Sequence, residues 1–480
     1  MAKNYFYNLL LTLANLLFPV LSFPYVSRVI GPEGIGHVQF VFSFAQYFTI
    51  IASIGVPIYG MKEISKYRND SHERSRVFSE LVILNLISCF LLSVLYMSII
   101  LSMHYFASNI EMYLVATILI LLGFTNVEWL YSGLEEFKSI ALRSVFFKIV
   151  SLILLYIFIR QRSDFRIYLY LMMFSYLANN VVSLFLLKNK VKIVLRDLHL
   201  ARHLMPLLYI LGTTLAASMY ADMDTVLLGF LSDNKTVGFY TAAVKLSKIS
   251  IPFVTSMAVI LLPKIANEFG ENNLDEAQLT LDKAFKFISF FGVPVVFGLA
   301  LLAPEFIMLF SGREFLPATN SMRLLSFLPL IVGFAHFLLF MILVPSGKNR
   351  QMFICVLFGV ISSLILNVLL IPKYQQVGSS IANIFSEIIV TALYFYVVKR
   401  YFKFIFNWSL LFKALFCAVL FIPLIWLIKE FNLSLIYTIV ASVLTCALVY
   451  LAVQSWLFKD KSIYELIKYA RSKLNHHVEI

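Results

Sequence analysis

The sequence predicts an all-α integral membrane protein with about 14 transmembrane helices. Two observations lead to this fold class. The 480 residues are 60% hydrophobic and only 14% charged, whereas a soluble domain is about half apolar and a quarter charged. Apolar runs recur from Leu9 to Trp456 with short polar breaks between them. Each run is near the length of about 20 residues that a helix needs to cross a bilayer with its backbone hydrogen bonds satisfied.

The apolar runs define the spans in order. They are 8–28, 37–60, 77–102, 112–132, 142–160, 167–187, 205–231, 237–262, 285–311, 323–345, 351–371, 378–398, 408–428 and 433–457. The first run follows Lys3 and resembles a signal peptide, but it lacks a small-residue cleavage site and contains Pro19 and Pro24. We therefore expect it to be a retained helix, and the two prolines make it the main bending element.

Alternate loops are basic, which predicts the orientation. An even number of spans puts both termini on one side, and the positive-inside rule makes that side the cytoplasm. The loop holding Arg160, Arg162 and Arg166 is the exception. The same rule explains the net charge of +13 without nucleic acid. The cytoplasmic loop cations are Lys62, Lys66, Arg68, Arg74, Arg76, Lys188, Lys190, Lys192, Arg196, Arg202, Lys348, Arg350, Lys399, Arg400 and Lys403.

The longer polar segments show no sign of a catalytic domain. Segment 188–204 alternates cations with apolar residues, which predicts a helix lying on the inner leaflet. The four cysteines all fall in apolar runs, so we expect neither a disulfide nor a metal site. Ser346-Gly347-Lys348 lacks the glycine spacing of a phosphate-binding loop. With no nucleophile–base pair in a loop either, the sequence predicts a protein that is not an enzyme and has no cofactor.

The sequence contains a weak internal repeat with a spacing of about 200 residues. Gly31 and Gly36 flank the break between the first two spans, as Gly229 and Gly238 flank that between the seventh and eighth. Parallel repeats are a recurrent plan in transporters. The repeat predicts a first six-helix bundle at 1–187, a cytoplasmic linker at 188–204 and a second bundle at 205–398. Two extra transmembrane helices at 399–457 and a basic cytoplasmic tail at 458–480 follow.

Charged residues inside spans are the first candidates for function, since each costs from about 3 to more than 10 kcal/mol at the bilayer centre. Asp222 and Asp224 lie in the seventh span, and Lys245 and Lys248 lie at similar depth in the eighth. The two lysines are three residues apart and share a helix face. They could form the cationic wall of a substrate cavity or a structural ion pair with the aspartates, and the two readings can coexist.

Other cations and carboxylates are also candidates. Arg28 and Lys148 could meet an anion or extend to the nearest interface, and Arg143 is expected to be an interfacial anchor. Glu128 and Glu387 suit proton or sodium coupling, with a hydrogen bond to a neighbouring helix as the alternative. Within the spans, Asn367 and His336 are the expected satisfied polar core residues.

Three segments resemble the polysaccharide transporter family, whose Wzx-type members export O-antigen and capsule repeat units. They are 23–36 (FPYVSRVIGPEGIG), 128–135 (EWLYSGLE) and 223–229 (MDTVLLG). The resemblance implies the fold of the multidrug/oligosaccharidyl-lipid/polysaccharide superfamily, in which two six-helix bundles form a V beside two peripheral helices. The first segment is the most specific, and the likeness extends over essentially the whole chain.

The resemblance also implies a function. The expected substrate is an undecaprenyl-diphosphate-linked oligosaccharide for O-antigen in lipopolysaccharide, or for another polysaccharide. It would be flipped to the periplasmic leaflet of the bacterial inner membrane by alternating access. Coupling to H⁺ or Na⁺ and partnership with a polysaccharide polymerase and a chain-length regulator are further expectations. A diphosphate needs cations, which agrees with Arg28, Lys148, Lys245 and Lys248.

Two alternatives remain open. A drug exporter of the same fold is one, although its usually cationic substrates fit poorly with the cationic eighth span. A membrane polymerase or glycosyltransferase is the other, and it should carry a sizeable outer loop or catalytic carboxylates there. The outer loops of this chain are short by the segmentation above.

Overall fold

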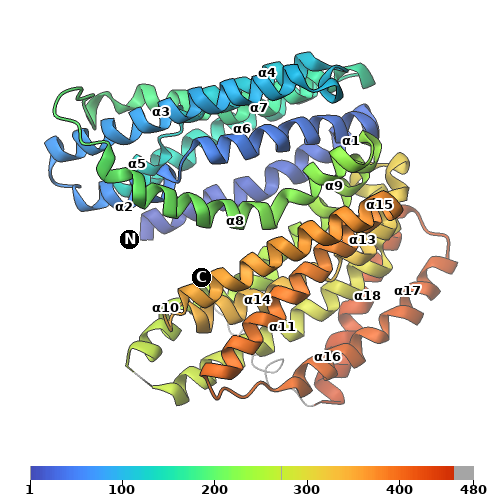
Figure 1. Cartoon of the computed structure of the whole chain (residues 1–480). Coiled ribbons are helices and arrows are strands. Elements are labelled where there is room, and N and C mark those ends of the chain that lie inside the picture. Colours follow the sequence, from blue (N-terminus) through green and yellow to red (C-terminus); the bar gives the residue numbers. More distant parts are fainter. Residues whose placement is uncertain (1, 272, 459–480) are drawn as a thin grey trace, which may run out of the picture. The chain divides into compact units, whose positions relative to one another are not determined.

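The computed structural model of the chain describes residues 2–271 and 273–458 (Figure 1), with the side chains of 2–5, 188–189, 217 and 220–222 outside the described set. Every regular element in this part of the chain is a helix, which confirms the predicted all-α class. The predicted basic tail lies outside the described residues except for Phe458.

The helices in chain order are α1 (Ala2–Ala52), α2 (Val56–Lys66), α3 (Ser71–Ser102), α4 (Ile110–Leu121), α5 (Glu128–Gly133), α6 (Phe137–Phe158), α7 (Phe165–Phe185), α8 (Ala201–Leu231), α9 (Asn234–Ile249), α10 (Ile251–Gly270), α11 (Leu274–Leu301), α12 (Ala303–Ser311), α13 (Thr319–Leu325), α14 (Leu328–Leu338), α15 (Asn349–Tyr401), α16 (Trp408–Val419), α17 (Phe421–Glu430) and α18 (Leu435–Trp456). Short helical turns η1 (His104–Phe106), η2 (Leu122–Thr125), η3 (Arg162–Asp164), η4 (Leu186–Asn189), η5 (Arg313–Ala318) and η6 (Leu339–Leu343) join some of them.

Eleven segments among the described residues are long and apolar enough to cross a membrane. Two of them contain a break, at Gly31 in α1 and at Gln375 in α15, so each provides two helical arms. When both arms are counted and the 31-residue α8 is added, every predicted span overlaps a helix. Large apolar side chains such as Phe90, Leu91 and Leu101 of α3 are more than half exposed, as lipid-facing residues are. The chain is a multi-pass membrane protein.

The break in α1 occurs at Gly31 and not at the prolines expected to bend the first helix. Gly31 has φ 79° and ψ 173°, a conformation that residues with a side chain rarely adopt, and Pro32 after it lacks a backbone N–H. Helical geometry continues through Pro19 and Pro24. The positive φ, rather than a missing hydrogen bond, therefore separates the two arms.

The chain forms two compact units. The first contains the described residues of Met1–Thr241 together with Ser363–Ser379, and the second contains those of Ala242–Ser362 and Ser380–Ile480. The division into bundles at 1–187 and 205–398 stays a prediction. In the second unit, α11, α16, α17 and α18 enclose an apolar core, and Tyr450 donates a hydrogen bond to the Phe290 carbonyl at 2.8 Å. All four cysteines are buried.

In the first unit the second arm of α1 runs antiparallel to α8. The Tyr47 hydroxyl donates to the Ser218 carbonyl at 3.2 Å, and nearer the break Gly229 lies against the Phe40 ring. At the break itself Gly36 and Gly238 approach backbone to backbone. These two glycines occupy equivalent positions in the proposed repeat.

Segment 188–204 is not the surface helix that its alternating cations predicted. From Val191 to His199 it contains no helix or strand, and it lies along the first turns of α3. The amides of Lys192 and Val194 donate to the hydroxyls of Ser75 and Ser79, at 3.1 and 2.8 Å. Because α3 side chains satisfy these backbone groups, the segment does not need to become helical.

Candidate functional site

A cluster of polar groups surrounds Asp224 in the first unit, and we call it the Asp224 cluster. The carboxylate is 3% exposed. One oxygen accepts a hydrogen bond of 2.6 Å from the Tyr240 hydroxyl of α9. The other accepts from the Asn367 amide at 2.8 Å and from the Ser363 hydroxyl at 3.4 Å, both on α15. A carboxylate at this depth needs such donors because water does not solvate it there.

The Asp224 cluster extends across the break in α15. The Ser379 hydroxyl, on the second arm, donates to the Asn367 amide oxygen at 3.0 Å, and both side chains are fully buried. Gln375 makes the break with φ 51°. Next to it, a Cβ on Gly378 would lie 2.4 Å from the Leu370 carbonyl oxygen, so only glycine lets the arms approach this closely. The cluster therefore joins α8, α9 and both arms of α15.

The Asp224 cluster has the chemistry to bind a small cation or a proton. It combines a carboxylate with three hydroxyls and an amide, and oxygen donors are what hard cations prefer. Protonation would instead remove the negative charge that the three donors stabilise. No group of three or more His, Cys, Asp or Glu side chains suited to a metal occurs among the described residues. The expectation that Asn367 is a satisfied polar core residue agrees with its hydrogen bonds, which also make it a partner of Asp224.

The structure places the predicted cationic residues in different parts of the chain. Lys245 and Lys248 are half-buried and lie in the second unit, on the last turns of α9. Arg28 is exposed and donates to the Pro24 carbonyl of its own helix at 2.6 Å. Lys148, on α6, donates to the Asn15 amide oxygen of α1. The side chain of Asp222 lies outside the described residues, so its pairing stays a prediction.

Glu128 lies in an ion pair at the start of α5. Its carboxylate accepts from the Asn179 amide at 2.8 Å and is 3.6 Å from the Arg143 guanidinium, which donates to the Asn179 oxygen at 2.8 Å. The Arg143 side chain is 5% exposed and lies over the Tyr131 ring. The expectation that Arg143 is an interfacial anchor is therefore wrong, because Glu128, Asn179 and Tyr131 hold it inside the first unit. Glu387 is half-buried on the second arm of α15.

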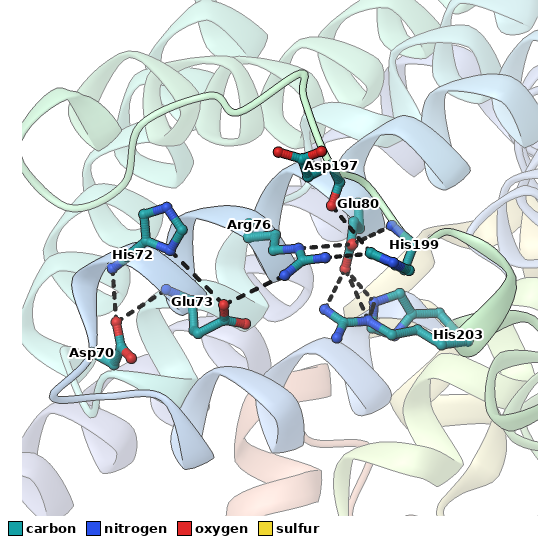
Figure 2. A network of polar contacts seen from close by, with 9 residues as sticks. Asp70, His72, Glu73, Arg76, Glu80, Asp197, His199 and His203 are labelled. Atoms are coloured by element: carbon teal, nitrogen blue, oxygen red, sulfur yellow. Dashed lines mark hydrogen bonds and ion pairs between the residues drawn. The ribbon is translucent and has the colours of Figure 1, made fainter.

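Figure 2 shows a second buried carboxylate, Glu80 of α3, that the sequence reasoning missed. It is fully buried, and its oxygens accept from the backbone amide of His199, from Arg202 and from the ring of His203, at 2.6, 2.6 and 2.8 Å. The other ring nitrogen of His203 is hydrogen-bonded to Tyr59 at 2.9 Å. The result is a charge-neutralised anchor that attaches the end of the linker to α3. The sequence signal that could have identified this site was Glu80 itself, a carboxylate at the fourth residue of the predicted span 77–102.

A polar cavity of about 300 Å³ lies between the second arm of α1 and α8, and we call it the amide cavity. Gln39, Ser43, Gln46 and Tyr47 line it from α1, and Thr225 lines it from α8. Sequence reasoning missed these residues because none is charged. The spacing of Gln39, Ser43 and Gln46 (i, i+4, i+7) was the available signal, since it puts all three on one helix face in the first half of the predicted span 37–60.

Comparisons with known proteins give a consistent result. The profile of a family described as polysaccharide biosynthesis protein matches residues 1–268. A protein of Shigella dysenteriae named as a putative O-antigen transporter is 22% identical over 83% of this chain and 100% of its own length. A probable lipid II flippase of Vibrio cholerae is 29% identical over 29% of this chain and 28% of its own.

Solved structures share the fold. The lipid II flippase MurJ in an inward closed conformation superposes with a TM-score of 0.73 and 16% identity, over 96% of this chain and 99% of its own. An inward-facing multidrug transporter of the MATE family gives 0.64 and 18% identity, over 80% and 94% of the two chains. The fold is therefore that of the multidrug/oligosaccharidyl-lipid/polysaccharide superfamily, as the sequence motifs implied.

Proposed function

Because this chain belongs to the polysaccharide biosynthesis protein family, we propose that it is a flippase for lipid-linked oligosaccharides. The observation that carries the proposal is the similarity to a protein named as an O-antigen transporter, which extends over 83% of this chain and all of that protein. The shared fold with a lipid II flippase adds support for the class of fold only, since the identity is 16%. The membrane helices provide the setting such a substrate requires.

In its finer form, the substrate is an undecaprenyl-diphosphate-linked repeat unit moved from the cytoplasmic to the periplasmic leaflet of the bacterial inner membrane. Both termini are cytoplasmic in this proposal, on the strength of the alternate basic loops. Arg28, Lys148, Lys245 and Lys248 are the candidates that bind the diphosphate. A polymerase and a chain-length regulator act on the product.

Ion coupling belongs to the same proposal, and the Asp224 cluster is its best-supported location. Asp224 is 3% exposed and accepts hydrogen bonds from the Tyr240 and Ser363 hydroxyls and from the Asn367 amide, so a change in its charge would alter several helix contacts at once. Binding of H⁺ or Na⁺ there would change the charge that holds α8, α9 and both arms of α15 together. Conformational change driven by an ion requires such a difference in interaction between two states. Glu387 is retained as a second candidate.

The test of transport is a deletion strain in which lipid-linked intermediates are counted in each leaflet. We expect complete repeat units to accumulate in the cytoplasmic leaflet, with loss of surface polysaccharide. If single repeat units reach the outer leaflet and remain unpolymerised, the protein is a polymerase instead. If neither the intermediates nor the polysaccharide changes, the flippase assignment is wrong and drug export becomes the better reading.

The test of coupling uses Asp224→Asn, with Asp282→Asn on α11 as the matched control outside the cluster. In vesicles with an imposed H⁺ or Na⁺ gradient, we expect Asp224→Asn to lose the gradient dependence of transport and the control to keep it. Full gradient dependence in Asp224→Asn would exclude this carboxylate as the coupling group.

A further inference from the structure

The amide cavity is polar although it lies between two helices that overlap predicted membrane spans. None of its lining residues is charged. Gln39 and Gln46 present amides, Ser43 and Thr225 present hydroxyls, and Phe42 and Tyr47 add aromatic rings. Amide groups both donate and accept hydrogen bonds. Placing them between such helices is unfavourable unless a polar ligand or water occupies the cavity.

Part of the cavity's hydrogen-bonding capacity is unused within the described chain. Gln39 donates to Ser43 at 3.1 Å, and Tyr47 donates to the Ser218 carbonyl at 3.2 Å, which fixes the walls. Neither the Gln46 amide nor the Thr225 hydroxyl has a hydrogen-bond partner among the described residues, although both line the cavity. A donor–acceptor pair is thus presented from each wall toward the space between them.

We propose that the amide cavity is a binding subsite for uncharged, hydroxyl-rich sugar residues, with Gln46 and Thr225 as specificity-determining residues. The proposal rests on the flippase function and narrows its substrate class to a glycan with a neutral segment. Sugar hydroxyls donate and accept, which matches amides and hydroxyls, and sugar C–H faces pack against aromatic rings. A charged sugar would be desolvated here without an opposite charge to compensate.

The size of the cavity limits what it holds. At about 300 Å³ it is at the lower end of the range for small-ligand pockets, about 300–1,000 Å³. It therefore takes a part of an oligosaccharide and leaves the diphosphate to residues elsewhere.

The amide cavity and the Asp224 cluster are connected through α8, because Thr225 and Asp224 are neighbours on this helix. Thr225 faces the amide cavity, and its neighbour Asp224 faces α9 and α15. Successive residues of a helix point about 100° apart, so one turn of α8 carries a wall of each site. A shift of this turn changes both together.

The experiment compares three fluorescent carriers in vesicles containing the full-length protein. All three are undecaprenyl diphosphates. The first bears a neutral hexose tetrasaccharide, the second bears the same tetrasaccharide with two uronic acids, and the third bears a single hexose. Gln46→Leu and Thr225→Val remove the proposed hydrogen-bonding groups. Gln454→Leu, at a buried glutamine of α18 outside the cavity, is the matched control.

We expect each cavity variant to slow transport of the neutral tetrasaccharide carrier about tenfold, the effect of losing one hydrogen bond worth about 1.4 kcal/mol. In the cavity variants, transport of the single-hexose carrier should stay near the wild-type rate. In Gln454→Leu, transport of the neutral tetrasaccharide carrier and of the single-hexose carrier should both stay near the wild-type rate. A uniform slowing of all carriers, or no change in either cavity variant, overturns the subsite. If the wild-type protein moves none of the carriers while correctly folded, the flippase function itself fails, which is a distinct result.

Discussion

The contact between Gly36 and Gly238 allows a prediction worked from distances. A Cβ added at Gly36 would lie 1.6 Å from the carbonyl oxygen of Asn234 and 2.6 Å from the backbone nitrogen of Gly238. Both obstacles are backbone atoms, so no change of rotamer can relieve the overlap. The second arm of α1 and the start of α9 must separate instead. We expect Gly36→Ala to destabilise this contact by at least about 1–3 kcal/mol, the usual cost of overpacking.

A cost of about 1–3 kcal/mol changes an equilibrium about 5- to 150-fold. The reciprocal variant Gly238→Ala would place a Cβ 1.9 Å from the carbonyl oxygen of Pro32. Because both substitutions open the same contact, the double variant should cost less than the sum of the single ones. Gly212→Ala on α8 is the control, since a Cβ there meets nothing within 4 Å.

The assay is thermal unfolding of the purified protein in detergent, run beside the transport assay. Gly36→Ala and Gly238→Ala should both unfold at lower temperature than Gly212→Ala, and transport should fall with them. Equal unfolding temperatures for Gly36→Ala and Gly212→Ala would refute the close backbone contact. Additive effects in the double variant would show that the two glycines do not share it.

Two further predictions concern Glu80 and Glu128, two carboxylates of the first unit. Glu80→Gln should weaken the attachment of the linker by about 1–3 kcal/mol, so trypsin should cut at Arg196 faster than in the wild type; an unchanged cleavage rate would contradict the anchoring role. Arg143→Gln should destabilise the protein because it leaves Glu128 without its cation, and adding Glu128→Gln should restore part of the loss. A double variant no more stable than Arg143→Gln alone would show that the pair is not coupled.

The sequence by itself determined the membrane class, the positions of the spans and the family. Each of these depends on local information. A segment enters the bilayer because its own 20 or so residues are apolar, whatever its neighbours are. The motif at 23–36 likewise combines a glycine and a proline at the break in α1, where only a residue without a Cβ readily takes the observed φ. Such requirements can be recognised one segment at a time.

Only the tertiary structure decided which polar groups meet. Asp224 accepts a hydrogen bond from Asn367, 143 residues away in the sequence. The linker amides donate to Ser75 and Ser79, more than 100 residues away. Arg143 was expected at an interface and is buried beside Glu128. The physical reason is that helices in lipid have similar hydropathy, so hydropathy does not determine which helices pack together. Small residues and a few hydrogen bonds therefore select the neighbours, and their choice depends on the whole fold.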